Sequence, residues 1–174
     1  MAVATAAPPQ AIAGVSPSLE REIETEFPTI GASAIGRLLG GIMNSIPVGI
    51  GSVKLSYLLF GLPLAPLGVI GYLQLKVTGQ RYTVTNRSVS VRGALAGQVV
   101  KQVALKDVGD VVVEVLGGQE FFRAGDVVIK NASGDEILRC AGVPQPDRFR
   151  HVILAARDAR LQSDDALAAI NRRK

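Results

Sequence analysis

The chain has 174 residues, 48% of them hydrophobic, and a formal net charge of +4 at pH 7. The basic excess is small, there is no tryptophan, and no basic cluster is interleaved with aromatic residues, which excludes a typical nucleic-acid-binding surface. The single cysteine, Cys140, excludes an intramolecular disulfide and a zinc site built from cysteines.

The N-terminal region, residues 1–33, combines an Ala/Pro-rich beginning with four glutamates between positions 20 and 26. Residues 1–17 lack the positive start and the compact apolar centre of a secretory signal, so we interpret them as a disordered leader. The rest of this region is expected to be a juxtamembrane segment, because a long apolar region follows it directly.

The apolar residues concentrate in two consecutive runs. Residues 55–75 contain 21 positions without a formal charge, and a helix of that length covers the hydrocarbon core of a bilayer, about 30 Å. Residues 34–53 form a weaker run, with Arg37 near its start, and Lys54 separates the two runs. We therefore predict a transmembrane helical hairpin over residues 34–75. Two alternatives stay open: a buried hairpin in the core of a soluble protein, and a single span formed by the second run alone.

Small residues one helical turn apart occur in both runs, at Gly36 and Gly40 and at Gly61 and Ala65. This spacing lets helix backbones approach each other closely. The region is rich in glycine, so we expect these pairs to serve packing within the hairpin rather than dimerisation.

The basic residues around the two runs predict an orientation. Lys76, Arg81 and Arg87 follow the second run closely, whereas Lys54 is the only basic residue between the runs. Because basic residues stay on the cytoplasmic side of a membrane, we expect the C-terminal domain to be cytoplasmic.

From Lys76 onward the apolar pattern changes to a period of two, which is typical of β-strands. In "RYTVTNRSVSVRG" two alternating stretches are joined by Asn86 and Arg87, which we interpret as a hairpin turn. Glycines punctuate the rest of the region. Further strands are predicted at residues 98–105, 110–116, 126–131 and 136–140.

One helix is predicted to close this domain. After the turn "GVPQP", Phe149, Ile153 and Ala156 follow the spacing of a single apolar stripe. We therefore expect a mainly β domain over residues 76–161, with this helix lying across its sheet, and a C-terminal tail over residues 162–174.

The stretches "RYTVTNRSVSVRG", "VALKDV" and "RAGDVVIKNASGDEILRCAGVPQPDRFRHVI", in this order, resemble the membrane-anchored bacterial pleckstrin-homology-like (PH) family, once catalogued as a domain of unknown function. The resemblance covers roughly residues 22–160. It implies two packed antiparallel sheets of six to seven strands, a C-terminal helix and a place at the bacterial inner membrane. It implies no reaction and no cofactor, because the family is not known for a shared active site.

Four basic residues are the candidate binding site: Lys76, Arg81, Arg87 and Arg92. They lie close in sequence to the predicted membrane exit, where they would contact anionic lipid head groups or a protein partner. The alternative is a solvated strand edge, where charged side chains prevent pairing with another sheet.

No catalytic or metal-binding constellation is evident. His151 has neither a second histidine nor an orienting acid near it, so we interpret it as a solvated residue of the helix. Cys140 alternates with Leu138 on one strand and is expected to be a small buried thiol. Phe121 and Phe122 are expected to anchor the core between strands rather than to form a binding patch. We therefore predict that the chain is not an enzyme.

These observations predict a non-catalytic, membrane-anchored binding or scaffold module at the cytoplasmic face of a bacterial membrane. It would contact a protein partner, another copy of itself or anionic lipid, and no nucleic acid. The alternative function is an accessory subunit of a larger membrane enzyme or transport complex, in which the hairpin packs against other helices.

Overall fold

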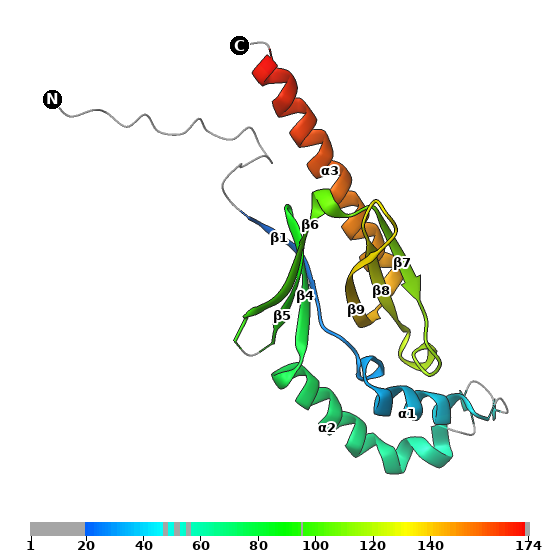
Figure 1. Cartoon of the computed structure of the whole chain (residues 1–174). Coiled ribbons are helices and arrows are strands. Elements are labelled where there is room, and N and C mark those ends of the chain that lie inside the picture. Colours follow the sequence, from blue (N-terminus) through cyan, green and yellow to red (C-terminus); the bar gives the residue numbers. More distant parts are fainter. Residues whose placement is uncertain (1–19, 47–48, 51–52, 55–56, 95, 173–174) are drawn as a thin grey trace.

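The computed structural model of the chain describes residues 20–46, 49–50, 53–54, 57–94 and 96–172. The predicted disordered leader, residues 1–17, lies outside the described residues. Two antiparallel sheets share one core, and the long helix α3 (Pro146–Arg172) lies along it. Two further helices, α1 (Ala34–Asn44) and α2 (Leu62–Thr78), lie at the end of the sheets that is remote from the C-terminus (Figure 1).

The strands confirm the predicted mainly β, two-sheet domain, and Asn86 and Arg87 join two of its strands as expected. The first sheet has the order β1-β4-β5-β6 and consists of β1 (Glu22–Glu26), β4 (Gln80–Thr85), β5 (Ser88–Gly93) and β6 (Val99–Ala104). The second sheet has the order β7-β8-β9 and consists of β7 (Asp110–Glu114), β8 (Ala124–Lys130) and β9 (Glu136–Pro144).

The core lies between the two sheets and α3. Alternate residues of β4 and β5, such as Val84 and Val89, point into it and are fully buried. From α3, Phe149, Ile153 and Ala156 are buried against them, which confirms the predicted apolar stripe. α3 then continues to Arg172, through most of the segment that was predicted to be a separate tail.

Strand β1 occupies residues that we expected to be a juxtamembrane segment. It pairs antiparallel with β4, whose edge would otherwise present unpaired main-chain groups. Two of its glutamates meet cations of distant elements: Glu24 Oε1 lies 2.8 Å from Arg148 Nη2, and Glu22 Oε1 lies 3.2 Å from Arg92 Nη1. The acidic run is therefore the edge strand of the first sheet. The basic residues that pair with it lie far along the chain, on β5 and α3.

The predicted transmembrane hairpin is wrong. Within the described residues, no helix is both long enough and apolar enough to cross a bilayer. α1 has 11 residues and α2 has 17, which correspond to about 16 Å and about 26 Å of helix, short of the 30 Å or so of a hydrocarbon core. Between them the chain forms a short strand pair, β2 (Gly49–Ile50) and β3 (Val53–Lys54), and a π-helical turn, η2 (Tyr57–Gly61).

The small residues of α1 pack against main chain outside α2: Gly36 against the Ile30 carbonyl just before α1, and Gly40 against the β domain. Gly36 and Gly40 are buried, and a Cβ atom on Gly40 would collide with the carbonyl of Gly118, in the loop after β7. A Cβ atom on Gly61, by contrast, would meet open space. The spacing does permit a close approach, as expected, but its partner is a loop that the sequence pattern does not reveal.

Candidate functional site

The structure brings two of the four predicted basic residues together. Arg81 on β4 and Arg92 on β5 are directly opposite each other, so their side chains share one face of the sheet. Arg92 is already paired with Glu22, at 3.2 Å. Lys76 is exposed in the last turn of α2, where its Nζ lies 5.7 Å from the centroid of the Tyr72 ring.

Arg87 lies apart from the other three basic residues. It is in the two-residue turn after β4, and the strand from Arg81 to Thr85 alone separates it from Arg81 by about 13 Å at some 3.3 Å per residue. Nearby, Glu20 Oε1 accepts hydrogen bonds from Ser88 Oγ (2.6 Å) and Thr85 Oγ1 (2.7 Å). These hydrogen bonds, and then the charges of neighbouring arginines, lower the pKa of Glu20. A carboxylate of the protein itself, that of Glu20, therefore already lies near Arg87.

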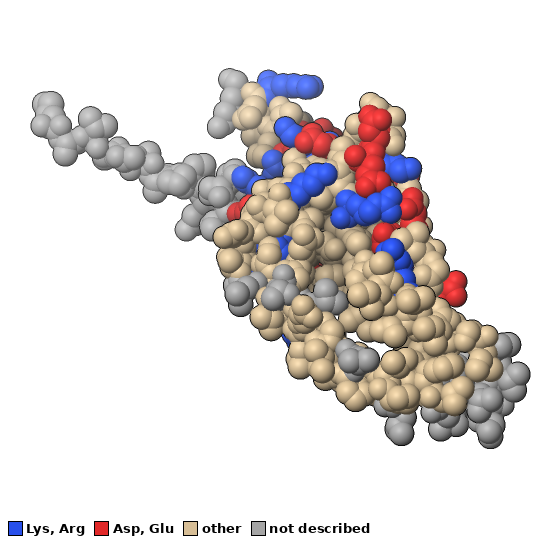
Figure 2. All heavy atoms as spheres, turned by 60° about the horizontal axis from the view of Figure 1, so that its bottom comes forward, with Lys and Arg blue, Asp and Glu red and all other residues tan. Residues whose placement is uncertain are grey.

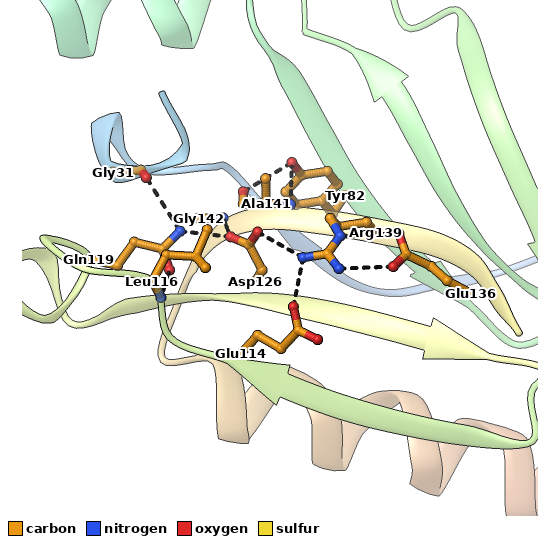
Figure 3. A network of polar contacts seen from close by, with 10 residues as sticks. All are labelled: Gly31, Tyr82, Glu114, Leu116, Gln119, Asp126, Glu136, Arg139, Ala141 and Gly142. Carbon is orange, nitrogen blue, oxygen red and sulfur yellow. Dashed lines mark hydrogen bonds and ion pairs between the residues drawn. The ribbon is translucent and has the colours of Figure 1, made fainter. Parts of the chain in front are cut away.

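A buried polar network is centred on Asp126 of β8 (Figure 3). The Asp126 carboxylate accepts hydrogen bonds from Gln119 Nε2 at 2.7 Å and from the Gly142 amide at 2.9 Å, and it pairs with Arg139 at 3.3 Å. Gln119 Nε2 also donates to the Gly31 carbonyl at 3.3 Å. The network thus ties the chain just before α1 to the second sheet. Because its buried groups satisfy one another, we assign it a structural role.

The two residues considered for chemistry have ordinary surroundings. Cys140 is fully buried, as predicted, and burial raises the pKa of its thiol to about 12, so the thiol stays protonated and unreactive. His151 is exposed on α3, with Nδ1 at 2.8 Å from the Asp147 carbonyl. Within the part of the chain that the structure describes, no cluster of three or more His, Cys, Asp or Glu side chains could hold a metal ion.

The most unusual surface of the molecule is the exposed side of α1, η2 and α2, which we call the helical face. Its large apolar side chains, each more than half exposed, are Ile35, Leu38, Leu59, Val69, Ile70, Tyr72, Leu73 and Val77. Residues 34–78 contain three basic residues and no acidic one. In Figure 2, charged side chains gather in the upper part of the view, and the region of α1 and α2 in the lower part is almost free of them. Exposed apolar surface of this extent marks an interaction site.

An apolar pocket of about 380 Å³ adjoins the helical face. It lies between α1, α2 and the short turn η4 (Glu120–Phe122) of the β domain. Phe121 packs edge-on against Tyr57 of η2, with ring centroids 5.6 Å apart. Phe121 and Phe122 are half-buried and line this pocket, whereas the sequence pattern predicted that they anchor the core between strands. The pair of adjacent phenylalanines in a loop was the only feature of the sequence that indicated this pocket.

The hollow exists because the last residue of η2 and the first half of α2 present small residues toward it. Gly61, Ala65 and Gly68 line the pocket at intervals of four and three residues, and so lie along one side of the helix. Val69 and Tyr72 line the pocket and also belong to the helical face. The pocket therefore borders directly on the exposed apolar surface.

Comparison with known proteins identifies the domain. The model of one family, the bacterial PH domain, matches residues 34–157, from the first residue of α1 into α3. No curated protein and no solved structure matches the chain. The match includes both helices of the helical face as well as the core of the two sheets, and it covers well over half of the chain. The chain belongs to the bacterial PH domain family.

Proposed function

We propose that the chain is a non-catalytic binding module that rests on an anionic membrane surface through its helical face. PH-like domains are generally non-catalytic modules that bind proteins or lipids. The observation that carries the proposal is the helical face itself: exposed apolar side chains on a segment, residues 34–78, that contains basic but no acidic residues. This combination is typical of helices that lie in the plane of a membrane interface.

The exposed apolar groups of α2 are stabilised if a membrane interface covers them. α2 has a single charged residue, Lys76, and apolar residues around its circumference. One side of α2 faces the pocket and η4, so apolar groups on the other side stay exposed whichever way the helix is rotated. A membrane interface removes them from water without requiring the helix to span.

Magnitudes indicate that apolar contact dominates binding. Burying a half-exposed large side chain contributes about 1 kcal/mol, and a basic residue near an anionic surface also contributes about 1 kcal/mol. The helical face offers more apolar side chains than residues 34–78 offer basic ones. Salt should therefore weaken binding without abolishing it.

Lys76 and Arg81 are the proposed head-group contacts, because they end α2 and begin β4, beside the helical face. Arg92 is engaged by Glu22, and Arg87 lies at the far end of β4. We propose the cytoplasmic side of a bacterial membrane as the location, since the only charged residues of residues 34–78 are basic.

A tryptophan reporter tests this orientation. The chain has no tryptophan, so Ile70→Trp places the only indole on the helical face. With phosphatidylglycerol-containing vesicles, its emission should move to shorter wavelength as the indole leaves water. Leu167→Trp is the matched control, because Leu167 is also an exposed apolar helix residue, on the part of α3 far from α1 and α2 (Figure 1). A shift of Leu167→Trp alone, or of neither variant, would reject the proposal and favour a protein partner for the helical face, as in an accessory subunit.

A further inference from the structure

The apolar pocket is too large to be a packing defect. Protein interiors contain few voids larger than a water molecule, whereas this pocket measures about 380 Å³. That volume falls in the range of small-molecule sites, roughly 300–1,000 Å³. The pocket is formed by separate elements, α1, α2 and η4, which meet around it without filling it.

The surroundings of the pocket have the chemistry of an amphiphile site. Its lining includes the side chains of Leu39, Met43 and Leu64 and the ring of Phe121, and among the described residues that line it none is charged. Tyr72 lines the pocket, and the ammonium group of Lys76 lies 5.7 Å from its ring centroid. An apolar hollow with a cation beside it fits a long hydrocarbon chain that carries an anionic head.

We infer that this pocket holds one acyl chain of an anionic lipid, drawn from the membrane on which the helical face rests, with the lipid head beside Lys76. The inference deepens the proposed function and rests on it for the source of the lipid. Val69 and Tyr72 belong to both the pocket and the helical face, so an acyl chain can pass from the helical face into the pocket without crossing water. The absence of acidic residues from residues 34–78 favours an anionic head over a cationic one.

Two glycine substitutions form a matched pair for testing the pocket. Gly68 lines the pocket, and a Cβ atom on it meets nothing within 4 Å, so Gly68→Leu places its side chain in the pocket without a clash at Cβ. Gly41 is a helical glycine of α1 that is equally open at Cβ but does not line this pocket, so Gly41→Leu is the control. Leucine is a better helix former than glycine, so neither variant should unfold the chain.

The first measurement uses a soluble probe, the fluorescent fatty acid cis-parinaric acid, with the full chain. Wild type and Gly41→Leu should bind one molecule each, and Gly68→Leu should bind at least about tenfold more weakly because its side chain occupies the space. Lys76→Gln should weaken binding by a few-fold, since one exposed charge is lost. Equal binding by Gly68→Leu and Gly41→Leu would overturn the inference.

The second measurement identifies the source of the acyl chain. After incubation with phosphatidylglycerol vesicles and re-isolation, native mass spectrometry should show one lipid on wild type and on Gly41→Leu, and none on Gly68→Leu. Failure of this result while Ile70→Trp still shifts on vesicles would reject the pocket and leave the membrane role intact. Parinaric acid binding that depends on Gly68, without any vesicle-induced shift, would reject the membrane as the source.

Discussion

Adjacent glycines of α1 should respond in opposite directions to the same substitution. A Cβ atom on Gly40 would collide with the Gly118 carbonyl and approach the Phe122 ring to 3.0 Å, whereas one on Gly41 would meet nothing within 4 Å. The Gly118 loop has little room to yield. Its φ of 87° suits glycine, and a Cβ atom on Gly118 would in turn collide with the Arg37 carbonyl.

The expected magnitude follows from two effects. Replacing a helical glycine by alanine stabilises a helix by roughly 0.5–1 kcal/mol, and this gain applies to both positions. At Gly40 the added methyl group also overpacks a contact with main chain, which costs about 1–3 kcal/mol. The helix effect cancels between the two variants, so Gly40→Ala should be less stable than Gly41→Ala by about 1–3 kcal/mol.

Thermal and urea unfolding followed by circular dichroism can measure this difference. For a chain of this size, 1 kcal/mol shifts the melting temperature by about 2–4 °C, so Gly40→Ala should melt several degrees below Gly41→Ala. The pair also distinguishes the observed fold from a spanning hairpin, in which α1 would not contact Gly118. A Gly40→Ala variant as stable as Gly41→Ala would refute the docking of α1 on the β domain.

Three further predictions concern the polar network, pH and lipid binding. Asp126→Asn should cost about 1–3 kcal/mol in urea unfolding, because the buried partners of the carboxylate lose a charged acceptor; no loss would contradict a structural role for the network. Burial, and then a neighbouring carboxylate, raise the pKa of Glu26. The Glu26 carboxyl group therefore binds a proton more tightly in the folded state than in the unfolded chain, so its protonation stabilises the fold as pH falls. Glu26→Gln should therefore be more stable than wild type near pH 7 and lose that advantage near pH 4, and a constant difference in free energy of unfolding across this range would argue against it. Lys76→Gln combined with Arg81→Gln should weaken vesicle binding and reduce its salt dependence, whereas Arg87→Gln should leave both unchanged; an equal effect of Arg87→Gln would contradict the proposed contact surface.

Local patterns were sufficient for the strands β4 to β9 and for the first part of α3. The period-two alternation around Val84 and Val89 and the stripe of Phe149 and Ile153 each depend on which side chains must leave water, and neighbouring residues alone specify that. These elements formed where the sequence predicted them. The turn at Asn86 was predictable for the same reason.

Contacts between distant residues decided the remainder. The acidic run became β1 because β4 offered a free edge and because Arg92 and Arg148 supplied cations from other elements. Neither partner is visible in a local window of sequence. The division of the predicted basic set has a local cause instead, since the length of β4 separates Arg87 from Arg81.

The helical segment shows most clearly where sequence and tertiary structure divide. From the sequence alone, residues 34–78 are apolar, lack acids and must be covered by something other than water. Hydrophobicity has no direction, so it cannot distinguish helices that cross a bilayer from helices that lie beneath a β domain. The contact of Gly40 with Gly118, and the pocket left by the small residues of α2, exist only once the chain has folded, because they join main chain that is far apart in sequence.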